Sequence, residues 1–406
     1  MSSERHASSA LRVRALGQRG MTLIELMVAL VIGLGVTLVV TTLLIAGENH
    51  KRTTTSTNDA EQTGAYVFHS IDGVLRGAGS AIAESAYPTP DAGLLGCKLN
   101  AGGILPAAAA FPAPFGGFLG GASSTLRVAP LLIGRNQSPD GKSDVLAVMG
   151  GSGAAGGVSR QVTVAGNATT ITLDNAVGFV ASDLFLVSQN GTADCLLEEV
   201  ASVATPTLTL DTTLPYYTNG GATSISTLAA STSSYVTPLG NAAVNNLQFE
   251  LIGVDANHTL YSYDLLENQS LVQNPGSTDA AQAIADGVYE MHAIYGIDTN
   301  GDGILDTWAG PGDVGYDINT VMITPATMRK IIAVRVALVL RGQYYDKNTV
   351  SPTTLTLFSG MTTSTGTALP ALAQPVNLSL IDQHYRYRVF EFTVPLRNMI
   401  LLAGGP

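Results

Sequence analysis

The fold is decided near the amino terminus, where the chain reads Gln18-Arg19-Gly20-Met21-Thr22-Leu23-Ile24-Glu25-Leu26-Met27-Val28-Ala29-Leu30. This stretch opens an apolar run from Met21 to Ala46 in which Glu25 is the single ionisable side chain. As a helix, the run would be about 39 Å long, enough to cross a bilayer core of about 30 Å. A charge inside such a run costs about 2.5–3.5 kcal/mol on insertion scales, so we expect Glu25 to have a functional partner.

The charge of the chain changes sign across this run. Residues 1–20 carry four arginines against Glu4, a net charge of +3, and the remaining residues carry −14. Because the cytoplasmic flanks of membrane helices are rich in basic residues, this asymmetry predicts a cytoplasmic amino terminus and an exported remainder. The net charge of −11 for the whole chain argues against broad electrostatic binding of nucleic acid or anionic lipid.

An ordinary secretory signal has a shorter apolar region that is followed by a small-residue cleavage site. This segment has a longer apolar region and shows no such cleavage site. One interpretation is therefore a signal anchor, a single membrane helix that stays uncut. The residues quoted above support another, because they resemble the class III signal of type IV pilins and pseudopilins. In that family a prepilin peptidase cuts after the glycine, here Gly20, and methylates the new terminal amine, here on Met21. Residues 1–20 would then be a cleaved leader.

The resemblance also assigns a role to Glu25, which would be the family's assembly residue. In a filament of staggered subunits, its carboxylate could lie level with the terminal amine of a neighbouring subunit, and two unpaired charges would become one pair. The sequence departs from the family pattern in two ways: Met21 stands where phenylalanine is more usual, and no proline interrupts the membrane helix. Neither departure removes a required group.

The helix is expected to continue beyond the apolar run, so that it covers residues 21–79 in all. Apolar residues recur at spacings of three and four between Ala60 and Leu75, and Gly77 and Gly79 follow them. From 80 to 240 the chain is rich in Gly, Ala, Ser and Thr, and short strand patterns such as Leu196–Val203 predict an antiparallel β insertion.

Stronger strand patterns occupy residues 241–406. Four of them, Leu247–Leu251, Val288–Ile297, Ile332–Arg341 and Arg386–Val394, are expected to form the sheet that receives the helix. Length, strand order and the large insertion resemble the PilW type of minor pilin. The resemblance implies an α+β, type IV pilin-like fold, in which a long helix, half of it transmembrane, packs on an antiparallel β-sheet.

One loop has the oxygen spacing of a calcium site. Asp298, Asn300, Asp302 and Asp306, with the carbonyl of Ile304, follow the first nine positions of an EF-hand loop, and a glycine stands at the sixth. The twelfth position is an alanine instead of the usual glutamate, and no flanking helix pair is expected. The alternative is a solvated turn of Asx and Gly residues without a metal.

The two cysteines, Cys97 and Cys195, both lie in the part predicted to be exported, where disulfides persist. A disulfide between them would tie the insertion together and stabilise the chain by roughly 4–5 kcal/mol on the chain-entropy model. The alternative is a pair of buried free thiols.

No catalytic residue can be nominated. The six histidines show no HExxH spacing, and no serine has G-x-S-x-G support. Glycines between Gly151 and Gly156 match G-x-G-x-x-G, but a strand pattern follows them where a dinucleotide site needs a helix. His292 and His384 are expected to be structural residues within strands. The sequence therefore does not predict an enzyme.

The resemblance implies a minor pilin that enters a type IV pilus and helps to start its assembly, with a tip location expected from the size of its head. It would support attachment, twitching motility or DNA uptake. The alternative is a J-type pseudopilin of a type II secretion system. Before assembly the subunit would wait in the bacterial inner membrane with its head in the periplasm, and afterwards it would lie in the cell-surface pilus.

The implied partners are other minor pilins and the major pilin, the prepilin peptidase and the inner-membrane assembly platform, with a large tip adhesin as a further candidate. Direct contact with nucleic acid is not predicted. No cofactor is required, and Ca²⁺ at the 298–306 loop is the one ion that the sequence suggests.

Overall fold

The computed structural model describes most of the chain as two compact units, residues 1–55 and residues 56–406. The described residues are 20–83, 94–101, 111–121, 126–151, 158–189, 194–214, 216–217, 224–230, 232–244, 246–266 and 281–403. The leader prediction for residues 1–19 and most of the G-x-G-x-x-G match therefore lie outside the described residues.

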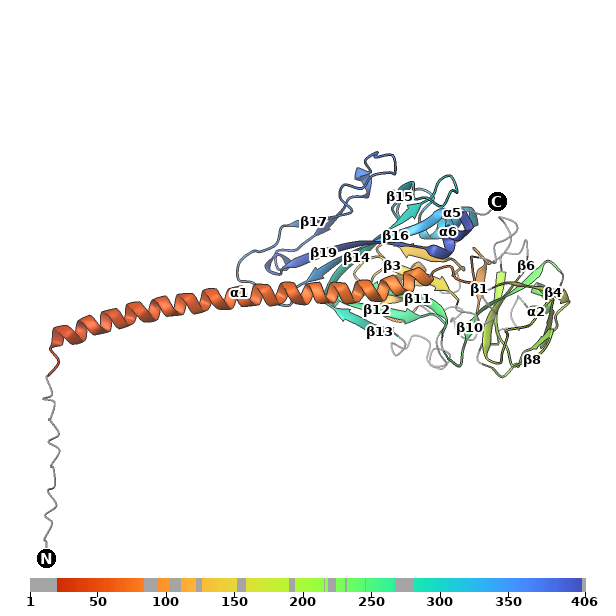
Figure 1. Cartoon of the computed structure of the whole chain (residues 1–406), viewed down its shortest axis with the longest axis horizontal. Coiled ribbons are helices and arrows are strands. Elements are labelled where there is room, and N and C mark those ends of the chain that lie inside the picture. Colours follow the sequence, from red (N-terminus) through yellow and green to blue (C-terminus); the bar gives the residue numbers. More distant parts are fainter. Residues whose placement is uncertain are drawn as a thin grey trace, which may run out of the picture. The chain divides into compact units, whose positions relative to one another are not determined.

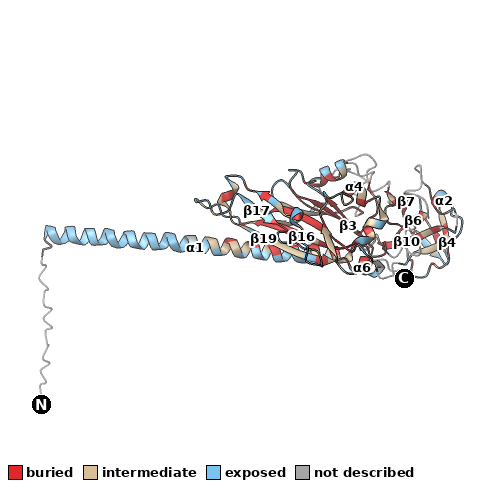
Figure 2. Cartoon of the chain, turned by 90° about the horizontal axis from the view of Figure 1, so that it is seen from above, coloured by how far each residue is buried: buried red, intermediate tan, exposed pale blue. Residues whose placement is uncertain are grey.

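Helix α1 (Leu23–Gly77) is the longest described element, at 55 residues. It begins where Thr22 accepts hydrogen bonds from Glu25 and Leu26, to its hydroxyl and carbonyl oxygens respectively. Its apolar part is exposed along its whole length (Figure 2) and is long and apolar enough to cross a membrane. The hydroxyls of Thr37 and Thr41 donate to carbonyls of the preceding turn, so these polar side chains satisfy their hydrogen bonds within the helix.

The part of α1 from Ser56 onward has one buried face. Ala60, Val67, Ile71 and Leu75 are at most 7% exposed and recur at helical spacing. This face packs on strands that come much later in the chain (Figure 1), as expected from the sequence. The helix ends at Gly77, and Gly79 turns the chain with a φ of 77°, a conformation that favours glycine.

The sheet under this face has four antiparallel strands. In spatial order they are β15 (Thr307–Ala309), β14 (Val288–Ile297), β16 (Ile331–Arg341) and β19 (Tyr387–Pro395). Every residue of β14 is buried, including the ionisable side chains of Glu290 and His292. Between β16 and β19 the chain forms the hairpin-like pair β17 (Thr354–Leu357) and β18 (Gln374–Asn377). Three of the four strands expected to form this sheet are therefore present in it.

The fourth expected strand lies in a different sheet. Five antiparallel strands pair in the order β13 (Ala281–Asp286), β12 (Thr259–Asp264), β11 (Gln248–Val254), β3 (Val145–Gly150) and β2 (Leu131–Gly134). The prediction that Leu247–Leu251 joins the helix-receiving sheet was wrong. A period-two pattern shows that one face of a strand is buried, but it does not specify the neighbouring strand. Because β2 and β3 belong to the segment 80–240, this sheet also crosses the boundary expected at residue 240.

The third large sheet has eight strands, all from the segment predicted as an insertion. Their order is β1 (Lys98–Asn100), β7 (Asp194–Glu199), β6 (Asp183–Gln189), β10 (Ser234–Asn241), β4 (Arg160–Val164), β5 (Thr170–Leu173), β9 (Thr207–Thr209) and β8 (Ser202–Ala204). A core that includes Val162, Ile171, Phe185 and Leu208 supports it. The single strand expected over Leu196–Val203 is two strands, because β7 pairs with β6 while β8 pairs with β9. β1 and β7 are parallel, whereas the other pairs are antiparallel.

Short helices complete the head. They are η2 (Phe115–Gly121), α2 (Ile225–Leu228), α4 (Ile318–Val321), α5 (Pro325–Lys330), η5 (Pro370–Leu372), η6 (Asp382–His384) and α6 (Arg397–Ala403). The predicted α+β class, with one long helix and a β-rich head, is confirmed.

Candidate assembly site

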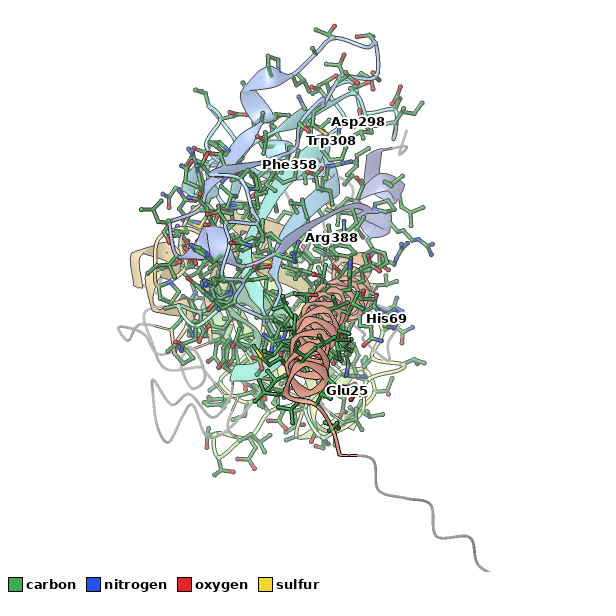
Figure 3. All side chains as sticks on the ribbon, turned by 90° about the vertical axis from the view of Figure 1, so that its left-hand side faces the viewer. Glu25, His69, Asp298, Trp308, Phe358 and Arg388 are labelled. Carbon is green, nitrogen blue, oxygen red and sulfur yellow. A yellow bond between two sulfur atoms is a disulfide. The ribbon has the colours of Figure 1, made fainter. Side chains whose placement is uncertain are left out.

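The candidate site begins with the residues around the start of α1. Gly20 and Met21 precede the helix and are exposed, as peptidase access would require. Glu25 lies in the first turn (Figure 3), where a negative charge also interacts favourably with the helix dipole. Among the described residues, no hydrogen bond or ion pair to the Glu25 carboxylate is present.

Thr22 and Glu25 also have the sequence spacing of a capping box. The backbone N–H of Glu25 donates to the Thr22 hydroxyl over 3.3 Å, which is one half of that motif. The acid at the third helical position therefore has a second, local use in starting the helix. An experiment on Glu25 must separate its charge from this capping role.

The rest of α1 is joined to the head by close packing. A Cβ on Gly64 would lie 2.8 Å from both Leu340 and Phe390, so a glycine allows the helix to approach β16 and β19 closely. The rings of Phe68 and Phe392 meet edge to face, with centroids 4.7 Å apart. The sequence pattern from Ala60 to Leu75 could predict the buried face, but not these strand partners.

Hydrogen bonds also join the end of the same helix to the head. Gln248 donates from Nε2 to the carbonyl of Val74 over 2.6 Å, and Gly79 N donates to the carbonyl of Met149 over 2.8 Å. Nearer the start of the helix, Arg388 on β19 lies 3.7 Å from Glu61. Because Glu61 and Arg388 are both more than half exposed, this pair contributes little stability.

Two comparisons with protein families match these two regions. A family model described as type IV pilus-assembly protein W matches residues 252–398, and a model of the prokaryotic N-terminal methylation motif matches residues 16–47. The chain carries a PilW domain. No protein with a curated description and no solved structure matches the chain.

The PilW domain contains the sheet that receives α1, together with β12, β13, β17 and β18. The methylation motif contains Gly20, Met21 and Glu25 and covers the apolar part of α1. The recognition of a PilW domain behind a class III methylation motif is thus confirmed, and the two matches support a type IV pilus-related pilin. Its methylation motif and apolar helix fit a membrane-anchored protein.

The loop after β14 within the PilW domain is organised by its own hydrogen bonds. Asp298 is 1% exposed; its Oδ1 accepts from the backbone N–H groups of Asn300 and Gly301, and its Oδ2 accepts from that of Gly303 over 2.7 Å. These bonds fold the loop over a buried carboxylate. Asp298 and Trp308 lie at the same end of the sheet (Figure 3).

The other two carboxylates of this loop are also bonded locally. Asp302 accepts from the backbone N–H of Ile304 over 2.8 Å, and Asp306 accepts from the hydroxyl of Thr299 over 2.6 Å. Hydrogen bonds from Thr299 lower the pKa of Asp306. Within the described residues, no group of three or more His, Cys, Asp or Glu side chains could hold a metal ion. The hydrogen bonds fit the alternative of an Asx and Gly turn, and calcium binding here stays a prediction.

Cys97 and Cys195 form a disulfide that closes a loop of 98 residues. The bond lies beside the parallel pair β1 and β7, in which Leu99 stands opposite Cys195. Both cysteines are nearly fully buried. The disulfide therefore holds the short strand β1, which has three residues, against β7.

The sequence did not reveal a buried charged cluster around His292. This histidine on β14 is 1% exposed; its Nε2 lies 3.1 Å from Glu290 and its Nδ1 lies 3.5 Å from Asp144. Burial lowers the pKa of His292, but hydrogen bonds with Asp144 and Glu290 outweigh it and raise the pKa to about 9. Asp144 also accepts from the backbone N–H of Ala293, so the cluster joins the segment before β3 to β14.

Glu290 and His292 are two residues apart on one strand, which places them on one face of the sheet. This spacing was the only feature of the sequence that could have indicated the buried cluster. Asp144 is distant in the sequence. His384 was expected to lie within a strand, but it ends the short turn η6, and its Nδ1 donates to the carbonyl of Asp346 over 2.9 Å. The prediction for His384 was wrong because the strand begins three residues later, at Tyr387.

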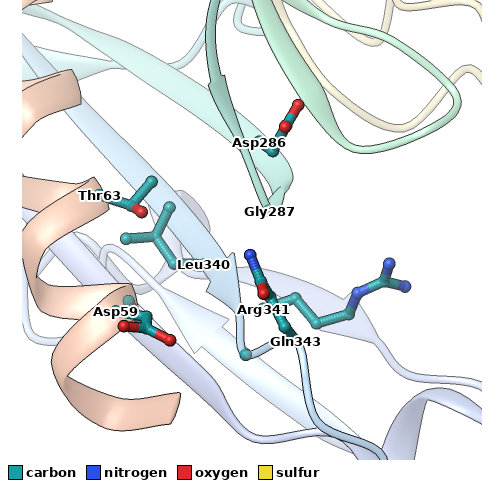
Figure 4. A pocket seen from close by; sticks show the side chains of 9 residues that line it. Asp59, Thr63, Asp286, Gly287, Leu340, Arg341 and Gln343 are labelled. Carbon is teal, nitrogen blue, oxygen red and sulfur yellow. The ribbon is translucent and has the colours of Figure 1, made fainter. Parts of the chain in front are cut away.

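A small hollow lies between α1 and the ends of β13, β14 and β16 (Figure 4). It is open to solvent and is lined by Asp59, Ala60, Thr63, Asp286, Gly287, Leu340, Arg341, Gly342 and Gln343. These side chains include two carboxylates and one guanidinium but no histidine, cysteine or serine.

Proposed function

We propose that this chain is a minor pilin that enters a type IV pilus and helps to start its assembly. The observation that carries the proposal is the Glu25 carboxylate, which has no partner among the described residues, in the first turn of an exposed apolar helix behind a methylation motif and ahead of a PilW domain. Removal of Gly20 and the residues before it would leave the amine of Met21 one helical turn from this carboxylate. Each subunit would then offer an acid and an amine to its neighbours.

The energetic argument rests on pairing. A lone carboxylate in hydrocarbon costs about 2.5–3.5 kcal/mol, and a buried charge whose partner is removed costs about 3–5 kcal/mol. Both costs fall when Glu25 of one subunit meets the terminal amine of the next. Assembly would therefore be favoured over the isolated membrane-anchored subunit.

The size of the head supports a location at the pilus tip. A compact body of the 351 residues from Ser56 to Pro406 would be roughly 50 Å wide. Such a head would be difficult to repeat in every subunit of a slender filament. A subunit at the tip would be placed for attachment, twitching motility or DNA uptake, in contact with other minor pilins, the major pilin and a large tip adhesin.

The test is complementation of a strain from which the gene has been deleted. Glu25→Gln removes the charge but keeps a residue that suits the capping box, whereas Thr22→Ala weakens the cap and keeps the charge. Glu48→Gln is the matched control, because Glu48 lies on the same helix beyond the apolar run. We expect Glu25→Gln to leave few surface pili, and Glu48→Gln to restore them.

Full piliation with Glu25→Gln would contradict the proposed pairing. Mass spectrometry of the native protein should show a chain that starts at N-methylated Met21. Normal pili together with lost protein secretion in the deletion strain would instead favour the J-type pseudopilin. Immunogold labelling along the whole shaft would contradict the tip location.

A further inference from the structure

Four exposed apolar or aromatic side chains gather on two loops of the head. Leu380 and Ile381 are 81% and 70% exposed, and Tyr344 and Tyr345 are 45% and 55% exposed. We call these four side chains the loop patch. An exposed isoleucine beside an exposed leucine and two tyrosines is the kind of surface that marks an interaction site.

The loops that carry the loop patch are held together by specific contacts. The ring of Tyr345 stacks on His384 at 4.9 Å and meets Tyr385 edge to face at 5.6 Å. Asp346 N donates to the carbonyl of His384 over 2.8 Å, and Arg386 pairs with the Asp346 carboxylate at 3.1 Å. These contacts hold the two loops together, and the four side chains of the loop patch are exposed on them.

The loop patch lies at the end of the head where the chain enters it. The first of its two loops starts at Gly342, which packs against Ser56 of α1 and donates to the carbonyl of Arg386 over 2.8 Å. Nine residues, 47–55, join Ser56 to the end of the apolar run at Ala46. Even when fully extended, nine residues span at most about 32 Å. When the run is inserted in a membrane, the chain keeps this end of the head near the lipid surface.

The charge of this region differs from that of the head around it. Residues 56–406 contain 14 basic and 28 acidic side chains, a net charge of −14. The segments 341–350 and 378–388 contain four basic side chains, Arg341, Lys347, Arg386 and Arg388, against Asp346 and Asp382, a net charge of +2. Three of these basic groups pair with carboxylates, Arg341 with Asp382, Arg386 with Asp346 and Arg388 with Glu61 of α1, so the net charge including Glu61 is +1. Tyrosines and basic residues around exposed aliphatic side chains have the composition of an interfacial membrane anchor.

We propose that the loop patch rests on the bilayer surface while the subunit waits in the membrane, with Leu380 and Ile381 among the lipid headgroups and the basic side chains near the phosphates. This inference rests on the proposed membrane anchoring of a pilin. The contact would hold the head close to the membrane and would be released when the subunit is drawn into the filament.

The test uses the full chain, one copy in each nanodisc, in phosphatidylethanolamine and phosphatidylglycerol whose acyl chains are brominated near the headgroup. Bromine quenches tryptophan only at short range, and Trp308 is the single native tryptophan. Ile381→Trp reports on the loop patch. Val314→Trp is the matched control, because Val314 is fully exposed on another loop of the head, and Leu38→Trp reports on insertion of the apolar run.

We expect bromination to lower the added emission of Ile381→Trp about twofold, since interfacial side chains enter roughly 5–10 Å into the headgroup and acyl boundary. Val314→Trp should be unaffected. Quenching of Leu38→Trp without quenching of Ile381→Trp would overturn the inference while leaving the membrane anchor intact. Absence of quenching at Leu38→Trp would overturn both the inference and the membrane anchor. Equal quenching at Ile381→Trp and Val314→Trp would show non-specific adsorption and would also overturn it.

Discussion

The buried cluster around His292 makes the stability of the head depend on pH. In the folded protein the pKa of His292 is about 9, against about 6.5 for a free histidine. Because the folded value is the higher one, the stabilisation is fully present below pH 6.5 and is lost as the pH rises through about 9. At about 1.36 kcal/mol per pKa unit, the difference corresponds to about 3 kcal/mol.

Other buried groups near β14 do not titrate in the same window. Burial raises the pKa of Tyr289 and of Tyr295 well above that of a free tyrosine, so both remain neutral. Burial lowers the pKa of His258, so this group favours the folded state more as the pH rises, the opposite direction from His292. A loss of stability between pH 6.5 and pH 9.5 can therefore be assigned to His292.

The assay is guanidinium unfolding of the full chain in mild detergent, followed by near-ultraviolet circular dichroism across this pH range. His292→Gln should lower the free energy of unfolding by about 3–5 kcal/mol at neutral pH, because Glu290 and Asp144 remain buried without their cation. It should also abolish the pH dependence. His69→Gln is the control, because His69 is exposed on α1 and its replacement should change neither quantity. The reasoning is refuted if the wild-type stability is constant from pH 6.5 to pH 9.5, or if His292→Gln shows the same slope.

Three other predictions concern single features of the head. Replacing both Cys97 and Cys195 by serine should lower the free energy of unfolding by about 4–5 kcal/mol, since the 98-residue loop is no longer closed; a thermal melt that matches the wild type would contradict this. Asp298→Ala should cost about 1–3 kcal/mol even without calcium, because three backbone N–H groups lose their acceptor, and chemical unfolding in a chelator measures it. Calorimetry should detect Ca²⁺ binding to the full chain at millimolar concentration, and a titration without heat would leave the 298–306 loop as a structural turn.

The parts that the sequence predicted correctly are those in which the decisive signal is local. The apolar run with its single acid, the helix to Gly77 and most strand segments follow from patterns within a few residues. The methylation motif is likewise a continuous stretch, and the family comparison confirmed it. The pairing of β11 was missed because a strand pattern shows which face is buried and not which strand lies beside it.

By itself, then, the sequence determined that the chain has a membrane-length helix with a lone carboxylate near its start, because hydrophobicity and helix capping act between near neighbours. Only the tertiary structure decided that Asp144 meets His292, and that the ring of Tyr345 stacks on His384. These contacts join residues far apart in the chain, and their stability comes from burial and desolvation, which exist only after the sheets have packed.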